Sequence, residues 1–156
     1  MYLYPHNDKW KAEFLYEKKL INTCSDTFID VLHIGSTAIQ GLYAKNCIDV
    51  LAMVNDIADI DDLKQGLVKL GYNYKGEYGI VGRQYFSKEH RKVHLHIFQK
   101  GDENIEKHLD FVAKMQNNAV LVAELNKLKI ELHEAFPNDK TAYQAGKAHF
   151  YEGLKK

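Results

Sequence analysis

Polar residues capable of chemistry interrupt the most apolar part of this chain. A β-branched run predicts a buried strand at Phe28–Ile34, which ends in the small-residue turn Gly35–Thr37. A second apolar run, Cys47–Val54, carries a single carboxylate, Asp49. An unpaired neutral polar group costs roughly 2–7 kcal/mol to bury, and a charge costs more. Asp49 is therefore predicted to meet a metal ion, a cation or a set of hydrogen-bond donors.

A later predicted strand, over residues 92–99, offers two imidazoles. His94 and His96 are two residues apart, and alternate residues of a strand point to the same face. Together with Asp49 they predict a metal site with three ligands. Imidazole nitrogen shifts the metal preference from magnesium toward zinc, manganese, iron or nickel. A His-x-His pair in a strand is also common as hydrogen-bonded structure, and this alternative stays open.

The turn before Asp49 has the composition of a phosphate-binding turn. The small residues Gly35 and Ser36 let backbone N–H groups come close to phosphate oxygens, which a bulky side chain would prevent. Lys45 lies between the turn and Asp49, where its cation would pair with substrate phosphate or with Asp49, the alternative being an exposed lysine. His33 is a third imidazole, a phosphate donor or a residue that fastens the turn to the sheet. We favour the fastening role.

Other polar residues are candidates for accessory roles. Tyr143 and Lys147 are four residues apart on a predicted helix and either reach the substrate cleft or support the sheet. Arg83 and Arg91 bracket a predicted antiparallel pair and are candidates for anion contacts, although most arginines at hairpin ends are solvated. The charged run at residues 88–92 is expected to be a solvated hairpin end.

The elements that must position these residues follow from hydrophobic periodicity and capping residues. Helices are predicted at about 9–23, 59–70, 102–115 and 119–136, with Asp8 and Asp102 as N-caps, and a last helix begins near the cap Asp139; strands are predicted at 28–34, 47–54, 72–75, 84–87 and 92–99. A helix, a sheet-rich middle and a helical C-terminal part indicate an α+β fold with a mixed sheet flanked by helices. No Gly-x-x-x-x-Gly-Lys-Ser/Thr pattern occurs, so a P-loop kinase is not supported.

Length and composition narrow the class of protein. The 156 residues are most simply one domain, 1–156. The 21 Lys and Arg side chains balance 21 Asp and Glu, so no nonspecific nucleic-acid binding is expected. A signal peptide pattern is absent, and no apolar run approaches the roughly 18–20 residues of a membrane span. We therefore expect a cytoplasmic protein without a membrane partner. Cys24 and Cys47 are predicted to be core thiols.

The candidate residues fall within a longer pattern. The stretches HIGSTAIQGL (33–42), AK (44–45) and IDVL (48–51) resemble the GrpB family of the nucleotidyltransferase superfamily, whose pattern is close to H-x-G-S-T-A/S-V/I-x-G-L-x-A-K-x-x-I/L-D-I/V. VHLHIF (93–98), HLDF (108–111) and Tyr143, Lys147 and Phe150 look like later landmarks of the same family. The resemblance covers almost the whole chain. It implies a mixed sheet with helices and, from the wider superfamily, metal-dependent transfer of a nucleotide.

The chain departs from the superfamily at one position. In the superfamily a strand with Asp-x-Asp or Asp-x-Glu follows the turn by about ten residues, and its carboxylates hold magnesium ions that bridge triphosphate and nucleophile. Here the residue two after Asp49 is Leu51, which cannot bind metal. A standard site for two magnesium ions is therefore not expected.

These observations give one leading function and two alternatives. The leading function is a metal-dependent nucleotidyltransferase-like enzyme that binds a nucleotide or another small molecule carrying phosphate. Its catalytic residues would be Asp49 and Lys45, its phosphate-binding residues Gly35, Ser36, Thr37 and Lys45, and its metal ligands Asp49, His94 and His96, with magnesium, manganese or zinc as the metal. The alternatives are a metal-assisted phosphoester hydrolase and a catalytically inactive nucleotide-binding or regulatory module.

Overall fold

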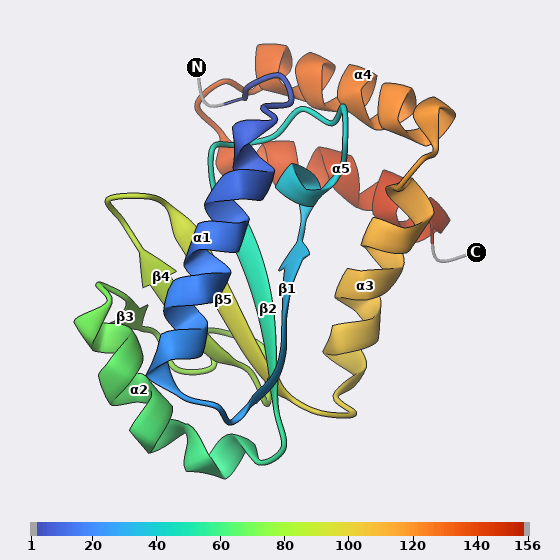
Figure 1. Cartoon of the computed structure of the whole chain (residues 1–156). Helices are drawn as coiled ribbons and strands as arrows, with labels where there is room; N and C mark the ends of the chain where they lie inside the picture. The colour runs from blue at the N-terminus through green and yellow to red at the C-terminus, as the bar shows by residue number, and fades with distance from the viewer. Residues whose placement is uncertain (1–2, 155–156) are drawn as a thin grey trace.

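A mixed sheet forms the centre of the computed structural model, which describes residues 3–154 (Figure 1). Five strands lie in the order β1-β2-β5-β4-β3. Their bounds are β1 (Phe28–Ile34), β2 (Ile48–Val54), β3 (Asn73–Tyr74), β4 (Gln84–Lys88) and β5 (Val93–Gln99). Strands β2 and β5 pair in parallel, whereas the other neighbouring strands pair antiparallel. The central parallel pair brings Asp49 and the two histidines of the later strand onto adjacent strands.

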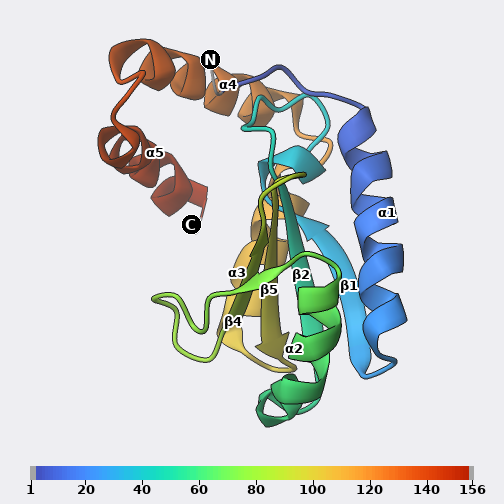
Figure 2. The ribbon, with the colours of Figure 1, turned by 90° about the vertical axis from the view of Figure 1, so that its left-hand side faces the viewer.

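Helices cover both faces of this sheet and one of its ends. They are α1 (Lys9–Cys24), α2 (Ile60–Lys69), α3 (Glu103–Met115), α4 (Ala119–Ala135) and α5 (Lys140–Leu154), with short 3-10 turns η1 (Ser36–Ala38) and η2 (Ile57–Asp59). In Figure 2, α1 and α2 lie on one side of the sheet and α3 on the other, while α4 and α5 lie beyond its upper end. The predicted α+β fold, a mixed sheet flanked by helices with a helical C-terminal part, is confirmed.

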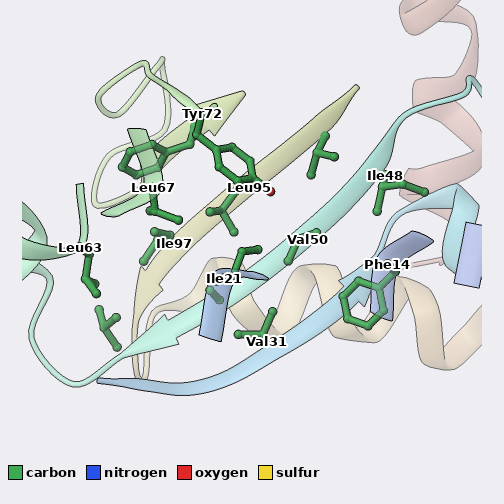
Figure 3. Close-up of a cluster of buried hydrophobic side chains, with 14 of the residues drawn as sticks. Phe14, Ile21, Val31, Ile48, Val50, Leu63, Leu67, Tyr72, Leu95 and Ile97 are labelled. Atoms are coloured by element: carbon green, nitrogen blue, oxygen red, sulfur yellow. The ribbon is translucent and has the colours of Figure 1, made fainter. Parts of the chain in front are cut away.

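Strand alternation divides the apolar side chains between two clusters. The larger cluster joins α1 and α2 to one face of the sheet (Figure 3). Its members include Phe14, Ile21, Val31, Val50, Leu63, Leu67, Leu95 and Ile97. The smaller cluster lies on the opposite face and joins Leu51 and Phe98 to Ile105 of α3. Asp49, two residues from Leu51, shares the α3 face of β2 but lies nearer the end of the sheet that α4 and α5 approach.

Most of the predicted elements agree with the structure, and the differences lie at their ends. The strand predicted at 47–54 begins one residue later, at Ile48, so Cys47 precedes it. The segment at 59–70 starts as a 3-10 turn before α2, and only Asn73–Tyr74 of 72–75 is a strand. Such shifts are expected because helix and strand ends are set by hydrogen-bond partners elsewhere in the chain.

Two of the three predicted N-caps make the expected hydrogen bond. The Asp102 carboxylate accepts from the Asn104 N–H at 2.8 Å, and the Asp139 carboxylate accepts from the Ala142 N–H at 3.0 Å. Asp8 stands at the N-cap position of α1 but makes no side-chain capping bond. The Asn7 side chain accepts the Lys9 N–H at 2.9 Å, so Asp8 occupies the predicted N-cap position but Asn7 supplies the side-chain hydrogen bond.

A buried ion pair ties α1 to β4. Glu17 is 3% exposed, and its Oε1 accepts from the Tyr72 hydroxyl at 2.8 Å and from Lys88 Nζ at 2.8 Å. Arg91 pairs with Glu13 of the same helix through its Nε at 3.0 Å. The expectation that residues 88–92 form a solvated hairpin end is therefore wrong for Lys88 and Arg91, because α1 packs over that end of the hairpin.

Candidate functional site

Asp49 lies against the turn that follows β1. Its backbone pairs with Ile34 in the antiparallel register, which places Gly35 directly beside its side chain. A β-carbon added to Gly35 would lie 2.8 Å from Asp49 Oδ2, and Gly35 has a φ of +74°. Both facts require glycine at this position, because a side chain would collide with the carboxylate and strain the backbone. The turn and the carboxylate are thus packed as one unit.

Two imidazoles contact the same carboxylate oxygen. The parallel register sets His94 opposite Asp49, and Oδ1 lies 3.5 Å from His94 Nδ1 and 3.3 Å from His96 Nε2. Burial raises the pKa of Asp49, but the hydrogen bonds and charges of the two histidines outweigh it and hold the pKa at about 2. The structure brings together the three side chains that strand alternation predicts as metal ligands.

Arg83 contacts the ring nitrogen of His96 that does not face Asp49. The Arg83 guanidinium lies 3.1 Å from His96 Nδ1 and also donates to the backbone carbonyls of Glu77 and Tyr78, at 3.2 and 2.8 Å. An arginine has only donors, so Nδ1 must accept, and the hydrogen of the neutral ring sits on Nε2 and points to Asp49. Arg83 is 6% exposed, so the expectation that it is solvated is wrong. The chain after β3 folds back over it.

A cavity of about 230 Å³ opens beside this cluster. It lies between the Gly35–Thr37 turn, the start of β2 and the helices α4 and α5. Its lining residues are Ser36, Thr37, Ala44, Lys45, Cys47, Asp49, His94, Lys129, Tyr143, Gln144 and Lys147. Seven of the predicted residues share this cavity, namely Ser36, Thr37, Lys45, Asp49, His94, Tyr143 and Lys147. The predicted residues His33, Gly35 and His96 lie outside its lining.

Lys129 of α4 is a site residue that sequence reasoning missed. Its ammonium donates to Ser36 Oγ at 2.7 Å and to the Tyr43 carbonyl at 2.7 Å, and the residue is 2% exposed. Burial, followed by the charges of Lys147 and Lys45, lowers its pKa to about 7. A signal was present, because Lys129 follows the apolar Leu125 by one helical turn and so falls on the buried stripe of α4.

Two more lysines face the same cavity. Lys147 of α5 is 8% exposed, and its Nζ lies 4.6 Å from the centre of the Tyr143 ring. Burial, with the charge of Lys45, lowers the pKa of Lys147 to about 8. Lys45 Nζ lies 5.7 Å from the same ring, and its pKa is lowered by burial and then by Lys140 and Lys92. Three lysines thus line the cavity, and two of them, Lys45 and Lys147, lie over the buried Tyr143 ring.

His33 makes the contacts expected of a residue that fastens the turn. Its Nε2 lies 2.9 Å from Thr37 Oγ1, and its ring stacks on Phe14 of α1 with centroids 4.7 Å apart. Its pKa is lowered to about 4, chiefly by burial. His33 lines a second cavity, of about 410 Å³, between α1 and the turn, which Thr37 separates from the first.

Cys47 does not belong to the core, contrary to the sequence prediction. It is half-buried, lines the cavity, and its Sγ and the ligand atoms of Asp49 and His94 all lie within 4.8 Å of one another. Burial, followed by the charge of Asp49, raises the pKa of the thiol to about 12. Cys24 does pack against the large apolar cluster, as expected.

The order and pairing of the strands define a nucleotidyltransferase-like fold. The chain superposes on the structure of the Cid1 poly(U) polymerase with Mg and 3'-dATP bound at a TM-score of 0.61, with 12% sequence identity over 91% of this chain and 49% of that chain. A sequence identity of 12% supports a shared fold and nothing more. The structure of Cid1 in complex with a UTP analogue, UMPNPP, gives a TM-score of 0.59.

The chain belongs to the GrpB family, whose model, described as GrpB protein, matches residues 1–156. The crystal structure of the conserved protein GrpB from Enterococcus faecalis superposes at a TM-score of 0.91, with 29% identity over 98% of this chain and 94% of that chain. The glutamate-rich protein GrpB of Alkalihalophilus pseudofirmus is 30% identical over 97% of this chain and 92% of its own length. The UPF0157 protein YqkA of Bacillus subtilis is 34% identical over 91% of this chain, which spans 42% of that protein.

Among the described residues, no helix combines the length and the apolar composition needed to cross a membrane.

Proposed function

We propose that this protein binds a phosphate-bearing small molecule, a nucleotide before any other, in the cavity beside Asp49, and that it is a metal-dependent nucleotidyltransferase-like enzyme. This proposal is carried by one observation: Lys45, Lys129 and Lys147 line the same cavity, and Lys129 donates a hydrogen bond to the Ser36 hydroxyl there. Like charges gathered in one partly buried cavity repel one another, which is part of why their pKa values are lowered. A ligand with several negative charges would relieve that repulsion.

The cavity also offers donors for a metal, but not those of a site for two magnesium ions. Asp49 is the carboxylate that lines it, and the neighbouring donors are the His94 imidazole and the Cys47 thiol. Magnesium prefers oxygen ligands, whereas zinc accepts imidazole, thiolate and carboxylate together. The donor set therefore fits a single ion of the zinc type. Such an ion would polarise a phosphoryl oxygen and stabilise the charge that develops on it.

The residues of the chain would contribute positioning and charge. In nucleotidyl transfer an acceptor hydroxyl or amine attacks the α-phosphorus, the bond to the bridging oxygen breaks, and pyrophosphate leaves with the developing negative charge. Lys129 and Lys147 would hold the phosphate groups and neutralise that charge, in a cavity where few water molecules screen it. Lys45 would contact the phosphate nearest Asp49. The Ser36 hydroxyl, fixed by Lys129, would donate to a phosphate oxygen.

Phosphoester hydrolysis is the second candidate, because imidazole and thiolate donors suit a metal that activates water. The two reactions differ in their acceptor. Incubation with each nucleoside triphosphate, with and without an amine or hydroxyl acceptor, would release pyrophosphate and the nucleoside monophosphate in the hydrolytic case, and pyrophosphate together with a nucleotidylated acceptor in the transfer case. Tight binding without turnover would identify the inactive binding module.

The proposal is tested by titrating the four common nucleoside triphosphates and inorganic triphosphate into the protein with magnesium, manganese or zinc present. Isothermal titration calorimetry should detect binding of at least one of them with one molecule per chain. If neither a nucleotide nor inorganic triphosphate binds with any of the three metals, the proposed function is wrong.

Replacing Lys129 with methionine is expected to weaken phosphate binding about tenfold to a hundredfold. A hydrogen bond to a charged group contributes about 1.5–3 kcal/mol, and 1.4 kcal/mol corresponds to a factor of ten in Kd. The substitution should not unfold the protein, because methionine fills the buried position without the cost of desolvating a cation. Lys127→Met, at an exposed position of the same helix, is the matched control and should bind normally. Equal affinities in the two variants would contradict the role given to Lys129.

Triphosphate affinity is expected to fall as the pH rises from about 7 to about 9. The polyanion binds the charged lysines, and the free protein has pKa values of about 7 at Lys129 and about 8 at Lys147, so it loses these charges over that interval. The second ionisation of a phosphate has a pKa of about 6, so it is largely complete above pH 7, and what remains of it would raise the affinity and not lower it. Calorimetry at several pH values should show the fall in the wild type and a smaller fall in Lys129→Met. A flat profile in the wild type would count against lysine-based recognition.

A further inference from the structure

We infer that Cys47, Asp49 and His94 form a thiolate-containing site for a zinc-type metal ion, and that His96 positions Asp49 without binding the ion. This inference deepens the proposed function and rests on it only in assuming that the cavity beside the turn is the functional one. It replaces His96 by Cys47 in the set of ligands predicted from the sequence.

The fold brings these three donors together by strand geometry. Cys47 lies immediately before β2, two residues ahead of Asp49, and both residues line the cavity, while the parallel register sets His94 opposite Asp49 on β5. Their ligand atoms all lie within 4.8 Å of one another. Around a tetrahedral zinc ion such atoms would be about 3.2–3.6 Å apart. A contraction of about 1 Å, within the reach of side-chain rotation, would therefore complete the site.

The hydrogen bonds of His96 withhold both of its nitrogens from a metal. Nδ1 accepts from the buried Arg83 guanidinium at 3.1 Å, and Nε2 carries the hydrogen that points to Asp49 Oδ1 at 3.3 Å. Metal binding through Nε2 would move the hydrogen to Nδ1, where it would face a cation that has no acceptor. His96 also lies outside the cavity lining, whereas Cys47, Asp49 and His94 all belong to it.

The chemical types of the three donors, a thiolate, a carboxylate and an imidazole, decide which metal ion they favour. Thiolate and imidazole favour zinc over magnesium, and three protein ligands leave a fourth position open for water or substrate, as in catalytic zinc sites. His96 acts through Asp49 and does not contact the ion itself. It donates to the Asp49 oxygen that faces the two imidazoles and so fixes the orientation of the carboxylate, as partners of ligating groups commonly do.

Cobalt(II) replaces zinc as a spectroscopic probe in the experiment that tests this inference. Co²⁺ is titrated into untagged protein freed of metal, and absorption is recorded in the near ultraviolet, where a thiolate ligand gives a charge-transfer band that nitrogen and oxygen ligands do not give. We expect the band in the wild type and in Cys24→Ser, the matched cysteine control. Cys47→Ser should lose the band and bind zinc at least tenfold more weakly in competition with a chelator. His96→Gln should retain the band.

Three results would overturn the inference: no cobalt bound, cobalt bound without the charge-transfer band, or the band retained in Cys47→Ser. Loss of the band in His96→Gln while circular dichroism shows the protein folded would make His96 a ligand and would overturn its positioning role. Binding of inorganic triphosphate is measured in the same variants. If triphosphate binds but the cobalt band is absent, only this inference fails, whereas a cobalt site without any phosphate binding leaves the metal site intact and removes the proposed function.

Discussion

Asp49→Ala is expected to abolish metal-dependent ligand binding and to leave the protein folded. Asp49 is the carboxylate of the cavity lining, and both imidazoles contact its Oδ1, so its removal takes away the anionic ligand and the group that organises His94 and His96. The fold should persist because the side chain is 30% exposed and contributes no apolar packing.

Calorimetry with a nucleotide and metal checks this expectation, with circular dichroism and thermal unfolding as measures of folding. Asp30→Ala, at an exposed position of the neighbouring strand β1, serves as the matched control and should bind as the wild type does. Unchanged binding in a folded Asp49→Ala would remove the role that we give to this carboxylate.

Lys88→Met is expected to lower the free energy of unfolding by about 3–5 kcal/mol, the usual cost of breaking a buried ion pair by removing one partner. The Glu17 side chain is 4% exposed and the Lys88 side chain 15% exposed, so water replaces the lost cation poorly. The Tyr72 hydroxyl would remain as a hydrogen-bond donor to the carboxylate, but it carries no charge. Urea denaturation gives the change directly.

The double variant Glu17→Gln with Lys88→Met should regain most of the lost stability, because it removes the unpaired charge together with its partner. A loss below about 1 kcal/mol in the single variant would mean that the pair is solvated as surface pairs are. Nucleotide binding per folded molecule should stay unchanged in both variants, because these residues do not line the cavity.

The part of the site that could be predicted from the sequence is the part set by local geometry. Alternation along β5 placed His94 and His96 on one face, and the small-residue turn placed Gly35 beside the strand that carries Asp49. The same rule applies on both sides of a residue. Cys47 stands two residues before Asp49, within the strand predicted at 47–54, so the rule places it on the same face as Asp49, as it does Leu51 on the other side.

The remainder depends on contacts that no local pattern encodes. Lys129 reaches Ser36 across 93 residues of sequence, and its burial depends on how α4 crosses the end of the sheet. Arg83 has the position of a solvated hairpin arginine, yet the backbone of residues 77–78 folds back to accept its hydrogen bonds. Composition and periodicity describe one element at a time, whereas both of these environments are created where distant elements meet.

The long sequence separation between Lys129 and Ser36 also bears on the order in which the molecule folds. The antiparallel pair β1-β2 involves neighbouring segments and closes a short loop, whereas the contact of Lys129 with the turn requires α4 to return to the N-terminal third of the chain. Longer loops cost more entropy to close, and such contacts tend to form late. Lys129 and Lys147, which line the cavity from α4 and α5, are thus expected to reach their positions after the sheet has formed. A nascent chain would have the carboxylate and its imidazoles in place before it could retain a polyanion.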